Sequence, residues 1–313
     1  MRPFQLLAGP GDVSDARGLA AAARRAEQIG IDVLVLTDHL IDQLAPIVAM
    51  TAAADATERL GVGTFVFNND LRHPAVLAQD LGSIDVLSGG RLQIGIGAGW
   101  NEPEYVAIGT PFEPVRVRQA RLAEAIAVLK GCFADGPFSF EGAHYTVRDY
   151  DARPKPVQRP HPPFLIGGGG RRTLELAARE AQVVGLAPRI LSGQRSEPGS
   201  ITGAGTAEKI GWVRDAAGHH FADLRLNVYP SGWPVTVTNE ARPVARQLVD
   251  RFRRRTGVEL TEAEVLESPH VFVGSIDGLE AKIREQRERL GIDSIMVGEL
   301  GELDALVERL AGT

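Results

Sequence analysis

The chain has 313 residues, of which 44% are hydrophobic and 24% charged, which is the composition of a globular protein long enough to bury a core. Its formal net charge of −6 argues against a nucleic-acid partner, and no run of about 18 apolar residues predicts a membrane span. The single cysteine, Cys132, excludes an internal disulfide, and together with the lack of a signal-peptide pattern it leads us to expect a cytoplasmic protein.

Eight short apolar runs alternate with amphipathic stretches along the chain, and they predict the strands of a parallel sheet. Each run is apolar on successive residues rather than on alternate ones, which is the pattern of a strand buried on both faces. The runs cover residues 4–7, 33–36, 62–66, 92–96, 164–166, 183–186, 224–228 and 294–297.

The stretches between these runs carry helix patterns with recognisable ends. Pro74 predicts the first turn of one helix, and the glycine pair at 89–90 predicts its end. A later helix is predicted to begin at Asp277, in capping-box spacing with Glu280, and to end at Gly291.

Two features that could suggest a function receive structural interpretations. Cys132 lies in an apolar helical stretch, and we predict a small core residue rather than a nucleophile. The arginine-rich run 251–255 lies in another predicted helix, where we expect a solvated face. Neither feature enters the site hypothesis.

Eight strand–helix alternations without a change of composition favour an α/β fold of the closed (β/α)8 TIM barrel type over an open sheet. We therefore expect residues 1–313 to form a single domain. Two stretches, 136–162 and 188–205, exceed ordinary strand-to-helix spacing, and we interpret them as insertions in the βα loops that act as lids or mobile segments. In such a barrel the chemistry lies on the loops at the carboxyl ends of the strands.

The second apolar run leads into Asp38 and His39. Such a pair at a strand end could hold a polar group of a cofactor and supply a proton-transfer group, because histidine titrates near physiological pH. The alternative is that Asp38 caps a loop and His39 is a packing residue. The residues alone leave both interpretations open.

The fourth apolar run leads into a glycine-containing turn that includes an indole. Glycines let backbone N–H groups approach a ligand closely, and the indole could flank a ring system. A plain polar turn would give the same short pattern. The residues are Gly97, Ala98, Gly99, Trp100 and Asn101.

The fifth apolar run leads into four consecutive glycines and then into a predicted helix. A glycine-rich turn at a helix N-terminus is suited to an anion, because free N–H groups and the positive end of the helix dipole meet there. Two arginines at 171–172 follow, so phosphate binding is favoured over a plain flexible turn. The glycines are Gly167, Gly168, Gly169 and Gly170.

Other chemistries have little support in the sequence. His219 and His220 are adjacent, so we expect their side chains to point apart, and no spacing typical of a zinc enzyme occurs. No phosphate-binding P-loop and no serine nucleophile elbow are found. We therefore expect no metal site and no hydrolase of these types.

Four segments in register carry a more specific pattern: AAARRAEQIGIDVLVLTDHL at 21–40, LGVGTFVFNNDLRHPAVLAQDLGSIDVLSGGRLQIGIGAGWNEPEY at 60–105, PFLIGGGGRRTLELAAREA at 163–181, and the segment 268–297. Together they resemble the luciferase-like monooxygenase family and, within it, the branch that uses the deazaflavin coenzyme F420. The resemblance covers nearly the whole chain.

The resemblance implies a barrel with insertions, a homodimer, and a flavin or deazaflavin at the barrel mouth. By position in the family pattern, Asp38 would hold the ring system and His39 would assist hydride transfer. Phe65–Val66 falls where relatives carry a non-prolyl cis peptide that backs the ring. The glycines at 167–170 match the phosphate loop.

One departure from the family pattern concerns the substrate. Sugar-phosphate dehydrogenases of this family have a glutamate after the glycines of strand 4, where this chain has Trp100, and their phosphate-binding lysines have no evident counterpart. A sugar phosphate is therefore disfavoured. We expect substrate contacts in the two insertions.

The function expected from these observations is transfer of a hydride between coenzyme F420 and a small organic substrate. The first alternative is an FMN-dependent monooxygenase that consumes oxygen, and the second is a non-catalytic flavin-binding protein. The cofactor supplies the redox chemistry in either enzyme, and the protein orients it and excludes water.

Overall fold

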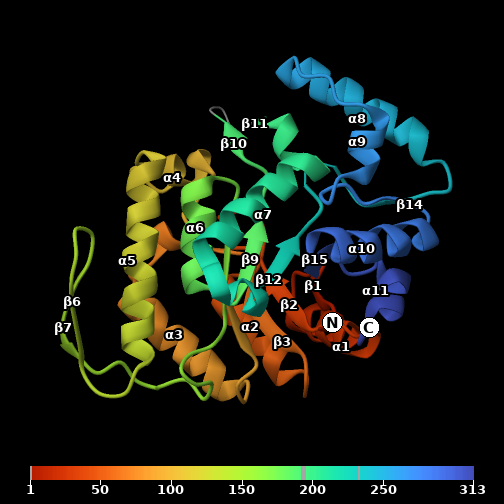
Figure 1. Cartoon of the computed structure of the whole chain (residues 1–313). Helices are drawn as coiled ribbons and strands as arrows, with labels where there is room; N and C mark the ends of the chain where they lie inside the picture. Colours follow the sequence, from red (N-terminus) through yellow and green to blue (C-terminus); the bar gives the residue numbers. More distant parts are fainter. Residues whose placement is uncertain (1, 192–194, 232) are drawn as a thin grey trace. The chain divides into compact units, whose positions relative to one another are not determined.

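The computed structural model describes residues 2–191, 195–231 and 233–313 (Figure 1). Its main sheet has the strand order β3-β2-β1-β15-β12-β9-β8-β5, and β3 also pairs with β5, so the sheet closes as the predicted (β/α)8 barrel. These strands are β1 (Gln5–Gly9), β2 (Val33–Leu36), β3 (Gly61–Thr64), β5 (Leu92–Gly97), β8 (Phe164–Gly168), β9 (Val183–Leu186), β12 (Arg225–Val228) and β15 (Ile292–Glu299).

All eight predicted strands are present, and their ends differ from the predicted ones by no more than two residues. The reason is their burial. Every residue of β2, with the sequence VLVL, and every residue of β5, with the sequence LQIGIG, is buried. Strands covered on both faces need continuous apolar runs, and such runs are the signal that the sequence carries most clearly.

The contacts within the chain group it into two compact units. Unit 1 comprises Met1–Gly11, Gln28–Asp32 and Gly167–Thr313, and unit 2 comprises Asp12–Glu27 and Val33–Ile166. The expectation of a single domain over residues 1–313 stays a prediction. Each unit is described by itself.

Unit 2 contains the parallel neighbours β2, β3, β5 and the start of β8, with Val33 opposite Gly61 and Ile94 opposite Phe164. Cys132 is buried in a helix of this unit, as predicted, and burial raises the pKa of its thiol. The further elements are α1 (Ala16–Ile29, which runs on into unit 1), α2 (Pro46–Asp55), β4 (Phe67–Asn68), a 3-10 turn (Asn69–Leu71), α3 (Pro74–Leu87), α4 (Glu102–Ala107), α5 (Val115–Phe133), β6 (Phe138–Glu141) and β7 (Thr146–Tyr150).

The ends of α3 agree with the sequence prediction. The helix begins at Pro74, and the imidazole of His73 accepts a hydrogen bond from the Ala75 N–H. Gly89 and Gly90, which follow the helix, have φ angles of 67° and 83°. Glycine adopts this left-handed backbone without steric cost, so the pair ends the helix.

The 136–162 insertion lies between α5 and the barrel strand β8, so it belongs to an αβ connection and the prediction of a βα loop was wrong for it. Its first half is the antiparallel hairpin β6–β7. The carboxylate of Glu124 on α5 accepts the backbone N–H groups of Ala143, His144 and Tyr145 at 2.8 to 3.1 Å. Burial alone would raise the pKa of Glu124, but these donors lower it. The hairpin is thus tied to α5 at its tip, and its role as a lid or mobile segment stays a prediction.

Unit 1 contains the parallel strands β9, β12, β15 and β1, in that order of pairing. A separate apolar cluster joins α8 and α9 and includes Ala245, Leu248, Val265 and Val271. The further helices are α6 (Arg171–Glu180), α7 (Gly203–Ala217), α8 (Ala241–Thr256), α9 (Glu262–Glu267), α10 (Ile276–Leu290) and α11 (Asp304–Leu310). The short strands are β10 (Ile190–Leu191), β11 (Arg195–Ser196), β13 (Thr236–Val237) and β14 (Val273–Gly274), and two 3-10 turns cover Pro198–Ile201 and Gly218–Asp223.

Two local predictions in unit 1 were wrong. Helix α10 begins after Ser275, whose hydroxyl accepts the Gly278 N–H, so Asp277 does not cap the helix. The predicted end at Gly291 is confirmed by its φ of 75°. The rings of His219 and His220 do not point apart, since their centroids lie 3.8 Å from each other. The cause is the 3-10 turn there, in which successive side chains do not alternate as they do in a strand.

The predicted helix around the 251–255 run is confirmed as α8. Arg253 and Arg254 are exposed, which agrees with a solvated face. Arg251 is half-buried instead, because its guanidinium lies 5.5 Å from the centre of the Trp233 ring. The 188–205 insertion also has structure within the described residues, namely β10, β11 and a 3-10 turn, while its residues 192–194 lie outside them.

Candidate functional site

Asp38 follows β2 in unit 2, and its carboxylate is held by protein donors. It is 4% exposed and receives two hydrogen bonds from the guanidinium of Arg72, at 2.6 and 3.0 Å. The Asn68 N–H donates to the same carboxylate at 3.0 Å. Asp38 thus fixes the segment after β4, and a contact to a cofactor ring stays a prediction.

His39 forms a dyad with a glutamate that the sequence analysis did not identify. Its Nδ1 lies 2.9 Å from Oε1 and 3.2 Å from Oε2 of Glu104, in the first turn of α4. Glu104 also accepts the Leu40 N–H at 3.3 Å and is only 6% exposed. The indole of Trp100 stands edge-on to the His39 ring, with centroids 5.6 Å apart. Loops after β2 and β5 therefore meet at this imidazole.

The dyad constrains the tautomer of His39. An ionised carboxylate at Nδ1 favours a proton on that nitrogen, which leaves Nε2 to accept or donate a proton. Nε2 makes no hydrogen bond to the described residues. A partly exposed imidazole that is oriented in this way can serve as a general acid or base.

A buried polar network supports the dyad from the next residue of α4. The Tyr105 hydroxyl donates to Asn68 Oδ1 at 2.9 Å or to Asp70 Oδ2 at 3.1 Å. Burial, with the nearby charge of Asp70, raises the pKa of Tyr105 to about 12, so the hydroxyl stays protonated. Arg121 pairs with Asp70 at 2.9 Å. The network joins α4 and α5 to the 68–70 segment.

The turn after β5 requires its glycine. Gly99 has a φ of 73°, and a Cβ there would lie 1.9 Å from the Tyr105 hydroxyl. The Arg118 guanidinium donates to the carbonyls of Ala98 and Gly99. The predicted residues Gly97 to Asn101 thus form one turn, which runs from the end of β5 to the start of α4. Trp100 in this turn is half exposed. The binding role of the turn is untested.

Phe65–Val66 is a non-prolyl cis peptide, as the family resemblance implied. It follows β3, in the same unit as Asp38 and His39. Its predicted contact with a ring stays a prediction.

The 136–162 insertion reaches the same loops. The Asn69 side chain donates to the Tyr145 hydroxyl at 3.3 Å, and the Tyr145 ring stands edge-on to His73 with centroids 5.3 Å apart. This agrees with an insertion near the site, whereas substrate contact stays a prediction.

The four glycines of unit 1 form a shorter turn than predicted. Gly167 and Gly168 end β8, and only Gly169 and Gly170 connect it to α6. A Cβ on Gly169 would lie 2.4 Å from the Pro188 carbonyl oxygen, so glycine permits a close backbone approach. Among the described residues no side chain caps α6, and an uncapped helix N-terminus is suited to an anion.

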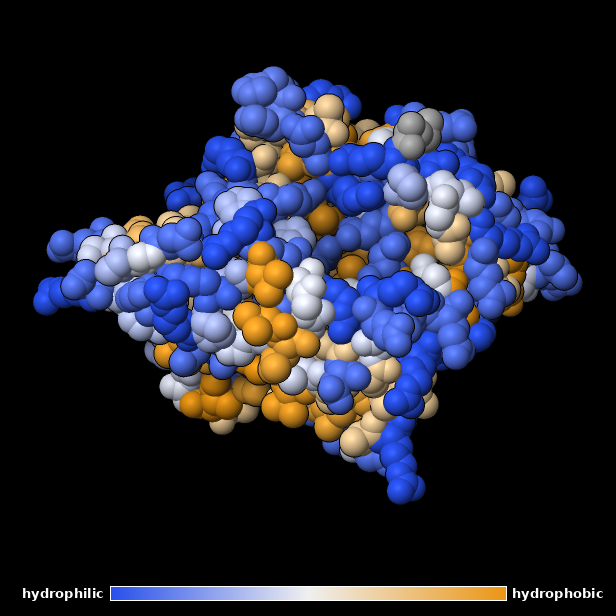
Figure 2. All heavy atoms as spheres, turned by 90° about the horizontal axis from the view of Figure 1, so that it is seen from below, coloured by the Kyte–Doolittle hydropathy of each residue, from blue (hydrophilic) through white to orange (hydrophobic). Residues whose placement is uncertain are grey.

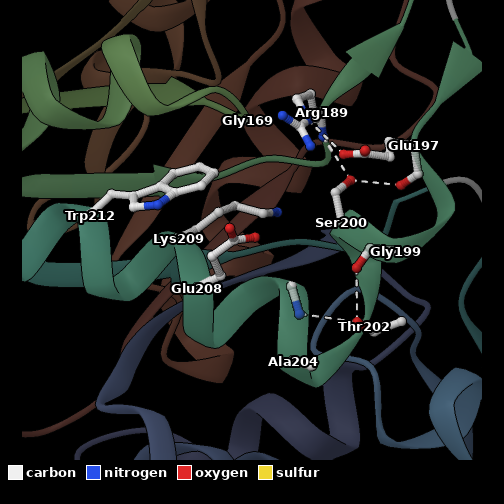
Figure 3. A pocket seen from close by; sticks show the side chains of 11 residues that line it. Gly169, Arg189, Glu197, Gly199, Ser200, Thr202, Ala204, Glu208, Lys209 and Trp212 are labelled. Atoms are coloured by element: carbon white, nitrogen blue, oxygen red, sulfur yellow. Dashed lines mark hydrogen bonds and ion pairs between the residues drawn. The ribbon is translucent and has the colours of Figure 1, made fainter.

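A pocket of about 500 Å³ opens beside this turn within unit 1 (Figure 3). The 188–205 insertion and α7 supply most of its wall. Sequence analysis missed its charged floor, because Lys209 is one of many residues on an ordinary amphipathic helix. The lining residues are Gly169, Arg189, Glu197, Gly199, Ser200, Thr202, Ala204, Gly205, Glu208, Lys209 and Trp212.

Residues 2–191, 195–231 and 233–313 contain neither a metal-site cluster nor a membrane-spanning helix. No group of three or more histidine, cysteine or acidic side chains is arranged to hold a metal ion. No helix there is both long and apolar enough to span a bilayer.

Comparisons with known proteins agree with the fold. The segment matching the FMNH(2)-dependent dimethylsulfone monooxygenase of Pseudomonas putida is 39% identical over 124 residues, or 40% of this chain and 34% of that protein. The F420-dependent glucose-6-phosphate dehydrogenase of Intrasporangium calvum is 34% identical over 155 residues, 46% of each chain. The chain thus matches less than half the length of these relatives.

A solved structure extends the likeness to the whole chain. The coenzyme F420 dependent tetrahydromethanopterin reductase from Methanopyrus kandleri superposes with a TM-score of 0.75, 19% identity, and coverage of 100% of this chain and 98% of that one. At this identity the likeness shows the fold. The model of the luciferase-like monooxygenase family matches residues 2–197. With the barrel and the ordered loops after its strands, this match shows that the chain belongs to the luciferase-like monooxygenase family.

Proposed function

We propose that the chain is an oxidoreductase that transfers a hydride between coenzyme F420 and a small organic substrate. The observation that carries the proposal is the His39–Glu104 dyad, with Nδ1 and the carboxylate 2.9 Å apart. A histidine that only packs would not need a buried carboxylate to orient it while its Nε2 has no partner among the described residues. Relatives named as F420-dependent dehydrogenases support this choice of cofactor.

The candidate residues for the ring and for the phosphate of such a cofactor are those that the sequence pattern assigned. In unit 2, Asp38, Phe65–Val66 and the turn from Gly97 to Asn101 would position the ring system, which supplies the hydride chemistry. Asp38 would act through the segment that it holds with Arg72. In unit 1, Gly169, Gly170 and the uncapped start of α6 would bind the phosphate.

His39 would handle the proton that accompanies hydride transfer. With Nδ1 held by Glu104, Nε2 can give a proton to a substrate oxygen or receive one from it. Glu104 would stabilise the imidazolium form, and Trp100 would keep water from one edge of the ring.

The second candidate is an FMN-dependent monooxygenase. A specific observation favours it, because the relative at 39% identity carries that name. The third alternative, a non-catalytic flavin-binding protein, leaves the oriented imidazole without a role.

Cofactor binding decides between the first two candidates. Purified protein is titrated with reduced and oxidised F420 and FMN, and oxygen uptake is followed with each reduced cofactor. We expect tighter binding of F420 and no oxygen uptake with it, since the deazaflavin has carbon at the ring position where flavins bind oxygen. Micromolar or tighter binding of FMN without binding of F420 would assign the monooxygenase instead.

A further inference from the structure

The pocket of unit 1 has one strongly buried charge in its wall. Lys209 on α7 is 2% exposed, and its side chain extends toward Arg189, Glu197 and Ser200 (Figure 3). Its ammonium group donates to the Ala187 carbonyl at 2.8 Å. An ammonium has three donors, so two N–H groups remain for another partner.

The other charges of the pocket do not neutralise Lys209. Arg189 already pairs with Glu197 at 2.6 Å, and Glu208 is exposed to solvent. Among residues 2–191, 195–231 and 233–313, no carboxylate lies within 4.0 Å of the Lys209 ammonium. The buried cation therefore makes no ion pair with the described residues, and Glu197 and Glu208 act on it only from a greater distance.

Burial without an ion pair makes the charged form of Lys209 unfavourable. Burial, reinforced by Arg189, lowers the pKa of Lys209 to about 8, although Glu197 and Glu208 oppose the shift. A buried charge is stabilised when an opposite charge with matching hydrogen bonds reaches it. An anion entering the pocket would supply both.

The rest of the wall is preformed. The Ser200 hydroxyl donates to the Glu197 carbonyl, and the Thr202 hydroxyl donates to the Gly199 carbonyl, so these groups hold the turn in place. Trp212, half-buried on the same helix as Lys209, gives the pocket an aromatic side. The pocket thus combines a fixed polar wall, one buried cation and one ring.

We propose that this pocket binds an anionic oxygen group, a phosphate or a carboxylate, with Lys209 as the charged partner and Trp212 as the wall for the adjoining organic part. The group belongs to the cofactor or to the substrate, and both share this chemistry. Its assignment to the cofactor rests on the proposed function, whereas the anion site itself does not.

The chain offers a matched pair of variants for the test. Lys209→Met removes the charge while keeping the length of the side chain. Lys282→Met is the control, because Lys282 also donates to one backbone carbonyl, that of Val271 at 2.6 Å, and burial lowers its pKa to about 7, yet it does not line the pocket.

The first probe is inorganic phosphate, measured as a shift in melting temperature and by calorimetry. We expect phosphate to bind the wild type and the Lys282→Met variant alike. Lys209→Met should weaken phosphate binding by about 10- to 100-fold, the usual value of a charge-assisted hydrogen bond. Equal phosphate binding by both variants, or none by the folded wild type, would overturn the proposal.

The second probe identifies the source of the anion. FMN is compared with riboflavin, and F420 with its phosphate-free deazaflavin chromophore. If Lys209→Met weakens binding of the phosphorylated compound of a pair but not of its phosphate-free partner, the pocket binds the phosphate of the cofactor or its acidic extension. If all four bind Lys209→Met normally while the variant loses inorganic phosphate, the site serves a substrate anion. If none of the four binds the wild type but phosphate binding depends on Lys209, the proposed function fails and the anion site stands.

Discussion

At the scale of the residue, His39 is an imidazole whose Nδ1 is held by Glu104 and whose Nε2 has no partner among the described residues. His39→Ala should lower kcat by about 10²- to 10⁴-fold, the usual contribution of general acid–base catalysis. Cofactor affinity should change little, because the phosphate is proposed to bind in unit 1. The rate of hydride transfer is measured in a single turnover, and a melting curve of the same protein measures its stability.

Glu104→Gln is the matched variant for the dyad. It keeps a hydrogen-bonding side chain but removes the charge beside His39 Nδ1, so we expect a smaller loss of kcat than for His39→Ala and a changed pH profile. A His39→Ala protein with a lowered melting temperature and a normal transfer rate would show that the imidazole only packs.

His270 in unit 1 predicts a dependence of stability on acid. Its side chain is fully buried, its Nε2 has no hydrogen-bond partner within the described chain, and burial, with the charges of Lys209 and Lys282, lowers its pKa to about 3. The Tyr229 carbonyl at 3.2 Å favours a proton on Nδ1 but does not offset burial. The folded protein therefore holds a neutral imidazole.

The sign of the effect follows from proton linkage. Below the ordinary histidine pKa of about 6.5 the unfolded chain binds a proton that the folded chain excludes, so stability falls with decreasing pH down to about 3. His270→Phe should remove up to about 1.4 kcal/mol per pH unit from this slope. Denaturant unfolding of both proteins between pH 4 and about 8 measures the difference, and parallel slopes would refute the assignment.

The residue scale also shows where sequence reasoning ended. It proposed Asp38, His39 and Trp100, because each lies in the loop that follows a recognisable strand. It missed Glu104, which lies 65 positions from His39 and has no local pattern of its own. A contact between side chains of two different loops cannot be predicted until the spatial arrangement of the strands before those loops is known.

At the scale of the element, the start of α6 is the sharpest test of phosphate binding. A Cβ on Gly168 would meet the Thr173 side chain at 2.5 Å, so a substitution there would confound binding with folding. Gly170 is the N-cap, has a φ of −101°, and has open space where a Cβ would lie. Aspartate is a favoured N-cap residue, so it should stabilise α6 in the ligand-free protein.

Gly170→Asp should therefore raise the melting temperature slightly and still weaken phosphate-bearing cofactors by at least about tenfold, through charge repulsion. Gly170→Asn supplies the same cap without the charge and serves as the control. Calorimetric titration measures the affinity of both variants for the cofactor. Unchanged affinity in Gly170→Asp would show that the phosphate does not bind at this turn.

Helices and strands could be predicted where buried residues leave a recognisable pattern in the sequence. The eight barrel strands and the ends of α3 follow from apolar runs, proline and glycine. The β6–β7 hairpin was missed because its residues are mostly exposed and its tip depends on Glu124 of α5. The cap of α10 was misplaced because Ser275 and Asp277 are both good caps, and packing decides between them.

At the scale of the whole molecule, the barrel was predicted from the order of elements alone, whereas the cofactor was not. F420 and FMN share a ring shape and a phosphate, so the sequence pattern of the candidate residues does not distinguish them. Relatives of both kinds match this chain.

The homodimer implied by the family is a proposal with a candidate surface in unit 2. Helices α2 and α3 pack on each other, and their exposed apolar side chains include Val48, Val76 and Leu87 at 69%, 58% and 68%. Apolar side chains also gather between hydrophilic ones on the face seen in Figure 2. Exposed apolar side chains on neighbouring helices are typical of an interface between copies.

Val48→Glu combined with Val76→Glu should convert a dimer to monomers without unfolding them, since both side chains are already exposed. Light scattering after size exclusion measures the mass. Val258→Glu, at an exposed position in unit 1, is the control. A monomeric wild type, or a double variant that stays dimeric, would contradict the proposal.

The pairing of β1 with β15 has a consequence for biosynthesis. Gln5 lies opposite Ser294 and Leu7 opposite Met296, so β1 waits during synthesis for a partner strand that is made much later. Until then β1 exposes an apolar edge, and nascent chains stalled before residue 292 should be substrates for chaperones. Release of β15 from the ribosome, rather than formation of any single βα unit, would then end chaperone dependence.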